Sequence, residues 1–154
     1  MTASPRSTIR RARAADVGAL LHLYQQLVSN PALSICPRQI SELETDADTA
    51  LLVMERGTAL VGTLLLCLCK DVMFQKQPFA VIENVVVDAQ ARGQGVGGAL
   101  LREAERLSAA RTASKILIMS NIERHDAHAF FTRLGYSGER KRGFVKYRRD
   151  FEVD

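Results

Sequence analysis

The sequence lacks a hydrophobic run long enough to cross a membrane. Its longest apolar stretch, Ala59 to Cys69, is interrupted by Gly62 and Thr63 and is far shorter than the roughly 20 residues of a spanning helix. The chain begins Met-Thr-Ala-Ser-Pro-Arg, which contains no apolar segment of the kind found in signal peptides. We therefore expect neither membrane insertion nor a secretory leader.

Cysteine is scarce, with Cys36, Cys67 and Cys69 as the three in the chain. The count is odd, and the spacing is not that of metal ligands. Cys67 and Cys69 lie two apart in an apolar run, so both side chains should face one side of a strand. We expect buried free thiols, which fit a reducing, cytoplasmic setting.

Internal repeats, low-complexity tracts and linkers are also absent from the sequence. The chain has 154 residues, 47% hydrophobic and 25% charged, which is ordinary for a globular protein large enough to bury one core. We expect a single domain over residues 7–154. Residues 1–6 are expected to form a loose terminus.

The net charge of +4 includes basic residues at 140–142 and between Lys146 and Arg149. Acidic residues are spread among the basic ones, and no expected helix carries a continuous basic face. A nucleic-acid partner is therefore not expected. A moderately positive surface also suits a ligand that carries several phosphates.

Hydrophobic periodicity and turn residues predict alternating strands and helices. Asp16 can cap the first helix, and Pro37 suits the first turn of the second. The expected strands are 9–13, 49–56, 59–69, 79–87, 115–120 and two more around 141–143. The expected helices are 17–28, a short one from residue 37, 97–111 and 125–134, and residues 70–78 are expected to be a loop that carries substrate contacts. This pattern indicates α/β character.

The stretch from Val81 to Leu100 organises the chain. A β-branched strand leads into glycines at positions 93, 95, 97 and 98, at the start of an amphipathic helix. The first N–H groups of a helix lack intrahelical partners and lie at its positive end, so they can bind an anion. Missing Cβ atoms would let a phosphate approach these amides. We predict a phosphate-binding turn; the alternative is a glycine-rich helix start that serves packing alone.

Two phosphate-binding motifs overlap here. Residues 93–98 fit the dinucleotide pattern G-x-G-x-x-G, but that fold needs several βαβ units around the motif, and only about one strand–helix unit follows. Residues 92–97, Arg-Gly-Gln-Gly-Val-Gly, fit [QR]-x-x-G-x-[GA]. With this motif the chain, from Ile9 to Phe151, resembles the GNAT superfamily of acyl-CoA-dependent N-acetyltransferases. Residues 127–136, AHAFFTRLGY, are similar to the family's A-x-x-F-Y-x-x-x-G-F.

The resemblance implies a GNAT-type α/β (α+β) fold, with a mixed central sheet of six to seven strands flanked by about four helices. It implies transfer of an acetyl group from acetyl-CoA to an amine. In the family the glycine turn holds the pyrophosphate on backbone amides, and the central strand splays from its neighbour to offer backbone groups to the pantetheine arm. The resemblance assigns these contacts to Val85, Val87, Arg92, Gly93, Gln94, Gly95, Val96, Gly97 and Gly98.

Glu83 is the predicted catalytic base. A protonated amine cannot attack a thioester, so a nearby carboxylate, directly or through a water, must take its proton. Glu83 is the one acid inside a strand that is otherwise nearly all apolar, and many family members carry an acid there. The alternative is a solvent-facing Glu83 or one paired with a neighbouring Arg. Asn84 should point to the other side of the strand, and the resemblance assigns oxyanion stabilisation to the amide around Val85.

The chain also departs from the family pattern. Family members often use the Tyr of the F-Y pair as the acid, but Phe131 holds that position. The family's pantetheine-binding Asn is replaced by Arg124, and Asn121 is a nearby substitute. We predict Asn121 and Phe131 as coenzyme contacts and leave the general acid unassigned, since a thiol with a pKa near 8.5 leaves with little help.

Residues 125–128 contain two histidines and an aspartate, but Asp126 and His128 do not share a helix face, so a metal site is not expected. The segment from Arg124 to His128 also resembles aminoalkylphosphonate N-acetyltransferases, which slightly favours a small primary amine as acceptor.

We therefore predict a cytoplasmic, bacterial N-acetyltransferase that moves the acetyl group of acetyl-CoA to a small-molecule primary amine by direct attack. One alternative is a protein N-terminal or lysine acetyltransferase. Another is an acyl-CoA-binding regulatory module with little turnover. A homodimer is compatible with the resemblance, whereas membrane partners are not expected.

Overall fold

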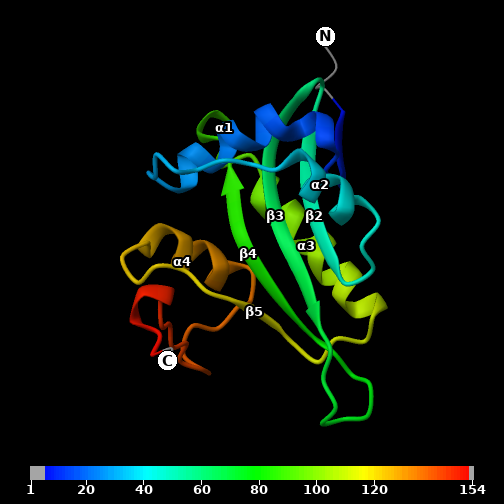
Figure 1. Ribbon diagram of the computed structural model, residues 1–154, viewed down its shortest axis with the longest axis vertical. Coiled ribbons are helices and arrows are strands. Elements are labelled where there is room, and N and C mark those ends of the chain that lie inside the picture. Colours follow the sequence, from blue (N-terminus) through cyan, green and yellow to red (C-terminus); the bar gives the residue numbers. More distant parts are fainter. Residues whose placement is uncertain (1–5, 153–154) are drawn as a thin grey trace. The chain divides into compact units, whose positions relative to one another are not determined.

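The computed structural model describes residues 6–152, and the chain divides into two compact units, one ending at Ile118 and one starting at Met119 (Figure 1). The predicted loose terminus, residues 1–6, lies outside the described residues apart from Arg6. The single domain expected from the sequence stays a prediction.

One sheet forms the centre of the first unit, with its strands in the order β1-β2-β3-β4-β5. The first four pair antiparallel, and β5 pairs parallel to β4. The strands are β1 (Ser7–Arg11), β2 (Thr49–Arg56), β3 (Ala59–Cys69), β4 (Phe79–Val87) and β5 (Ile116–Ile118). The bounds of β2, β3 and β4 agree with the sequence-based expectation.

Helices cover both faces of this sheet. In Figure 1, α1 (Val17–Leu27) and α2 (Pro37–Glu44) lie on one face and α3 (Val96–Ala110) on the other. The first face buries a cluster that includes Leu20, Ile40 and Val53. Within the described residues, no helix has both the length and the apolar character needed to cross a membrane.

The α3 face of the sheet depends on a glycine. A Cβ atom at Gly62 would lie 2.8 Å from Cγ1 of Val96 and 3.0 Å from Cδ1 of Leu100, so only glycine lets α3 approach β3 this closely. Leu64 and Leu66 follow on the same face and are buried. This packing fixes the start of α3, where the glycine turn lies, against the first half of β3.

Asp16 anchors the chain between β1 and α1, although not as predicted. Its side chain makes no capping hydrogen bond to α1. Instead it binds Arg10 through both carboxylate oxygens, at 2.7 and 3.0 Å, and accepts the Arg13 backbone N–H at 2.7 Å. The guanidinium engages both carboxylate oxygens, and such charge-assisted bonds are about twice as strong as those between neutral groups. The Arg10 hydrogen bonds hold the pKa of Asp16 below its usual range, although partial burial opposes this shift.

We expect Asp16→Asn to lower the free energy of unfolding by about 2 kcal/mol at pH 7, because a charge-assisted bond is lost at a side chain that is only 12% exposed. The folded-state pKa lies below the unfolded value, so this contribution is present above about pH 4. It should disappear as the pH falls through the folded-state pKa. Urea unfolding between pH 7 and pH 2.5 measures this, and a constant difference between variant and wild type across that range would contradict the assignment.

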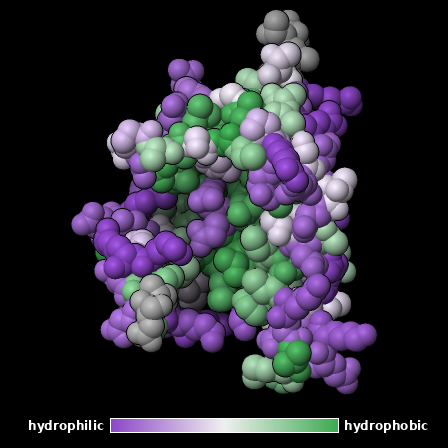
Figure 2. All heavy atoms as spheres, in the orientation of Figure 1, coloured by the Kyte–Doolittle hydropathy of each residue, from purple (hydrophilic) through white to green (hydrophobic). Residues whose placement is uncertain are grey.

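The loop between β3 and β4, residues 70–78, has an apolar tip. The exposed fractions are 88% for Val72, 75% for Met73 and 69% for Phe74. Figure 2 shows hydrophobic atoms at the lower end of the view, where the connection between β3 and β4 lies in Figure 1. The Asp71 carboxylate accepts the backbone N–H groups of Val72 and Met73, which shapes the turn into the tip. The predicted role of this loop in substrate contact stays a prediction.

The second unit contains α4 (His125–Arg133). As predicted, Gly135 closes this helix at the C′ position. Gly135 has a φ of 90°, its N–H donates to the Thr132 carbonyl at 3.0 Å, and the Tyr136 N–H donates to the Phe131 carbonyl at 3.1 Å. These two bonds form a Schellman motif, which needs the left-handed backbone that glycine adopts at low cost. A short 3₁₀ helix follows at Arg148–Asp150.

The α/β fold with a mixed sheet and four helices is confirmed, but the predicted strand count is wrong. The described residues contain five strands instead of six to seven, and the two expected around 141–143 do not form. Residues 137–147 are exposed, and no ladder partner for them is found within the described part of the chain. A strand needs a neighbour to pair with, so the residue pattern around Lys141 was insufficient evidence for one.

The cysteine prediction is also partly wrong. All three thiols are free, but Cys36 is exposed, and Cys67 and Cys69 are only half-buried. Cys36 lies in the loop before α2, and the two others lie toward the end of β3, beyond the part that α1 covers (Figure 1). An apolar strand predicts a buried thiol only where a second layer covers that part of the sheet.

Candidate functional site

One edge of β4 is open over its second half. β5 pairs only with Ala80, Val81 and Ile82, so within the described residues β4 pairs with β3 alone from residue 83 onward. The Asp88 N–H donates to the Val61 carbonyl, which makes Gly62 and Val87 a non-hydrogen-bonded pair.

The main-chain groups of Val87 therefore point away from β3, toward the open edge. The two-residue repeat of a strand gives Val85 the same orientation. The Val87 carbonyl accepts the Arg92 Nε–H at 3.2 Å, which leaves the Val87 N–H at this edge. The structure thus brings together Val85, Val87 and Arg92, three of the residues predicted to bind the coenzyme.

A β-bulge separates these residues from Glu83. Glu83 lies opposite Leu65 and Val86 opposite Thr63, so β4 has one residue more than β3 between the two pairs. The backbone accommodates the extra residue at Asn84, which adopts a left-handed conformation with a φ of 55°. Sequence analysis missed this bulge, although an Asn among β-branched residues is a usable signal, since Asn tolerates the left-handed region better than most residues.

Glu83 lies on the sheet face that carries α1 and α2. It is directly opposite Leu65, which packs against the core cluster on that face, and Cys67 lies diagonally across from it. Burial raises the pKa of the Cys67 thiol, and the charge of Glu83 adds a smaller increase. Glu83 is half-buried, and the two residues named across from it on β3 carry no charge.

The glycine turn has the geometry of an anion site. Gly93 and Gly95 have φ values of 72° and 81°, and nothing lies within 4 Å of the place where a Cβ would be at either residue. Gly95 is the N-cap of α3, and the first helical bond runs from the Ala99 N–H to its carbonyl at 3.0 Å. The N–H groups between Gly95 and Ala99 have no intrahelical acceptor. This open, positive helix end fits a pyrophosphate held on backbone amides.

Side-chain hydrogen bonds within the loop stabilise the turn. The Gln94 side chain donates to the Gln90 carbonyl at 2.8 Å and accepts from Arg56 at 2.6 Å, so it serves the loop itself. Val96, Gly97 and Gly98 are buried as α3 begins. Of the predicted coenzyme residues in this turn, Gly93, Gln94 and Gly95 are exposed, and Arg92 adds an exposed cation.

The remaining predicted residues, Asn121 and Phe131, belong to the second unit. The Asn121 side-chain oxygen accepts the Glu123 N–H at 3.0 Å, and the Asn121 backbone carbonyl accepts from His128 Nε2 at 2.9 Å. Phe131 is half-buried, and its ring lies 5.4 Å from the Phe130 ring and 6.3 Å from the Tyr136 ring. Within the described residues, no group of three histidine, cysteine or acidic side chains is arranged to hold a metal.

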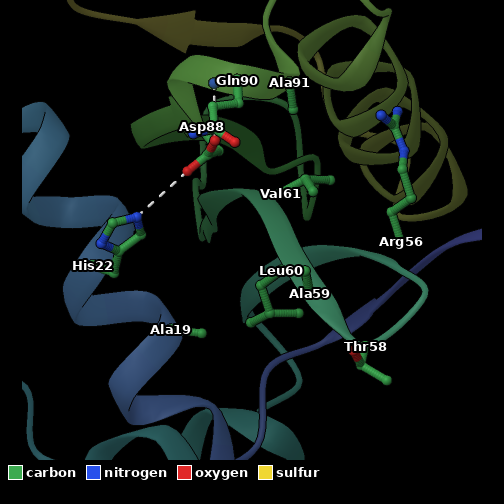
Figure 3. Close-up of a pocket in the computed structure, with 10 residues that line it drawn as sticks. All are labelled: Ala19, His22, Arg56, Thr58, Ala59, Leu60, Val61, Asp88, Gln90 and Ala91. Carbon is green, nitrogen blue, oxygen red and sulfur yellow. Dashed lines mark hydrogen bonds and ion pairs between the residues drawn. The ribbon is translucent and has the colours of Figure 1, made fainter.

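A pocket of about 520 Å³ lies elsewhere in the first unit, between α1, the β2–β3 hairpin and residues 88–91. Its lining, drawn in Figure 3, includes none of the predicted site residues. His22 of α1 and Asp88 point toward each other on its side, with Nε2 and Oδ2 3.5 Å apart. Asp88, three residues after Val85, is thus a polar group beside the turn that sequence analysis did not single out.

Known structures share this fold. One is described as "putative acetyltransferase from Agrobacterium tumefaciens str. C58", with 26% identity, a TM-score of 0.83, and coverage of 92% of this chain and 99% of that one. Glucosamine-6-phosphate N-acetyltransferase from Arabidopsis thaliana has 20% identity, a TM-score of 0.80, and coverage of 93% and 99%.

An aminoglycoside acetyltransferase from an uncultured soil metagenomic sample, in complex with sisomicin, has 17% identity, a TM-score of 0.78, and coverage of 92% and 95%. At such identities, the second and third likenesses show the fold alone. Among curated proteins, none matches the sequence.

The family comparison covers most of the chain. A model described as the acetyltransferase (GNAT) family matches residues 18–136, which include all of α1 but its first residue, the whole of β4, the glycine turn and α4. The chain therefore belongs to the GNAT family of acetyltransferases.

Proposed function

We propose that the protein transfers the acetyl group of acetyl-CoA to the primary amine of a small molecule by direct attack. One observation carries the proposal: the open edge of β4 leads, through residues 88–92, into a glycine turn whose two left-handed glycines have open space where a Cβ would lie. Bound acetyl-CoA would supply an acetyl group activated as a thioester. The turn suits its pyrophosphate, and the main chain of Val85 and Val87 suits an amide-bearing arm.

Glu83 supplies the base in this proposal. Its carboxylate lies on the α1 and α2 face of β4, two residues before Val85, at the point where β5 stops pairing. It would take a proton from the bound ammonium, directly or through one water, so that the neutral nitrogen can attack. The Val85 N–H at the open edge would stabilise negative charge that develops on the carbonyl oxygen.

Support for a small-molecule acceptor comes from two sources. The known relative in complex with sisomicin is an aminoglycoside acetyltransferase, which acts on a small molecule. The expected likeness of the segment Arg124 to His128 to aminoalkylphosphonate N-acetyltransferases would slightly favour a small primary amine.

Free-thiol release from acetyl-CoA tests this function directly. A panel of small primary amines, peptides with free N-termini and lysine peptides separates the proposed acceptor class from a protein acceptor. Turnover with small amines well above the rate of spontaneous hydrolysis supports the proposal. Binding of acetyl-CoA without turnover on any acceptor would instead favour a regulatory module, and turnover with peptides alone would favour a protein acceptor.

Phe131→Tyr tests whether the leaving thiolate needs a proton donor. We expect the rate to change by less than about threefold, because a thiolate is nearly stable at neutral pH and a general acid adds little there. The new hydroxyl needs a partner, or its burial costs about 1–3 kcal/mol. The steady-state rate should therefore be measured beside the melting temperature. A gain of about tenfold or more at unchanged melting temperature would show that protonation limits the natural protein.

A further inference from the structure

Helix α1 holds the segment that leads from β4 into the glycine turn. Gln26, in the last turn of α1, reaches this segment with both ends of its side-chain amide. Its Nε2 donates to Asp88 Oδ2 at 2.9 Å, and its Oε1 accepts the Ala89 backbone N–H at 2.9 Å. Because a backbone N–H can only donate, the Ala89 bond fixes which end of the amide is the oxygen.

Asp88 passes this restraint on to the following turn. Its second oxygen accepts the Gln90 N–H at 2.9 Å, and its carbonyl accepts the Ala91 N–H at 2.9 Å. The Gln26 hydrogen bond is the largest cause that holds the pKa of Asp88 below its usual range. His22 approaches the same carboxylate, as Figure 3 shows, but its side chain is 68% exposed and adds little. Gln26 is therefore the main link between α1 and this turn.

We propose that Gln26 is a positioning residue for the coenzyme-binding turn, an inference that rests on the proposed function. Residues 88–91 stand between Val87, at the open edge of β4, and Arg92, where the glycine motif begins. The placement of Asp88 and Ala89 thus sets where the amides of the turn lie relative to the strand. A ligand held on backbone amides tolerates little displacement, since such bonds weaken beyond about 3.2 Å. Gln26 acts through Asp88 and Ala89.

Gln26→Glu isolates this role. The new carboxylate keeps an acceptor for the Ala89 N–H but replaces the donor that faces Asp88 with a negative charge. We expect the KM for acetyl-CoA to rise about tenfold, the value of one charge-assisted hydrogen bond. The kcat and the KM for the amine should stay within about twofold. Gln25→Glu is the matched control, because it makes the same change at the neighbouring exposed position of α1 and should leave all three constants unchanged.

A second variant supplies a rescue. In Gln26→Glu/Asp88→Asn, the new amide at position 88 can donate to the new carboxylate, while its oxygen can still accept the Gln90 N–H. We expect the KM for acetyl-CoA to return to within about threefold of wild type, although each single substitution raises it. A double-mutant cycle on this KM gives the coupling between the two positions. Independent, additive effects would overturn the proposal.

The outcomes separate this proposal from the proposed function. Thermal stabilisation of the wild type by acetyl-CoA is measured first, and its absence would overturn both. A stabilised wild type whose KM for acetyl-CoA is unchanged by Gln26→Glu would overturn the role of Gln26 alone. If Gln26→Glu raised both KM values, lowered the melting temperature and was not rescued by Asp88→Asn, Gln26 would serve general stability. That outcome would also overturn the proposal.

Discussion

Glu83→Gln should lower kcat by about 10²–10⁴-fold, the usual contribution of a general base. Glutamine keeps the size of the side chain and its place opposite Leu65, but its amide cannot take a proton. The binding of acetyl-CoA should stay nearly intact, because the contacts proposed for it are main-chain groups farther along the strand and in the turn. Steady-state kinetics with a small amine, together with a thermal shift with acetyl-CoA, measure both quantities.

The pH dependence makes this test specific. At high pH more of the acceptor amine is already neutral, so the variant should recover part of its rate between pH 7 and pH 9. A matched control is Glu42→Gln on α2, where an exposed carboxylate pairs only with Arg38 at the surface. That variant should behave as wild type. An unchanged rate for Glu83→Gln from pH 6 to pH 9 would assign Glu83 to structure.

Strand and helix positions in the first unit could be predicted because the signals are local. Gly57, with a φ of 63°, separates two apolar runs, and the bounds of β2 and β3 follow from that turn. The glycine turn is equally local, since its residues are neighbours in sequence. The last two predicted strands failed because pairing is decided by a partner strand, and nothing in residues 137–147 encodes one.

In the candidate site too, the features with local sequence signals could be predicted. Glu83 stands out as an acid within an apolar strand, and the glycines mark the turn. The bulge at Asn84 leaves a weaker signal, because one residue type is compatible with several backbone conformations. The contact of Gln26 with Asp88 leaves none, since the two residues are 62 positions apart and only the packing of α1 on the sheet brings them together. Long-range polar contacts of this kind appear only once the fold is known.

Gly95→Val should abolish the stabilisation of the protein by acetyl-CoA. In the wild type, acetyl-CoA at about 100 times its Kd should add about 2.7 kcal/mol to the free energy of unfolding. For a chain of this size that corresponds to a rise of roughly 5–10 °C in Tm. NAD should give no such rise. A side chain at position 95 would point into the open space beside the start of α3, where the pyrophosphate is proposed to lie.

The substitution also strains the backbone, since valine is poorly tolerated at a φ of 81°. Gly135→Val provides the control, because Gly135 has a φ of 90° and equally open surroundings in the second unit. Both variants should lose stability without ligand, by about 1–3 kcal/mol for the strained residue. Only Gly95→Val should also lose the rise in Tm with acetyl-CoA, because only there does the new side chain occupy the place of the phosphates. If Gly95→Val kept the full rise, the turn would not be the pyrophosphate site, and stabilisation of the wild type by NAD instead of acetyl-CoA would contradict the proposed coenzyme.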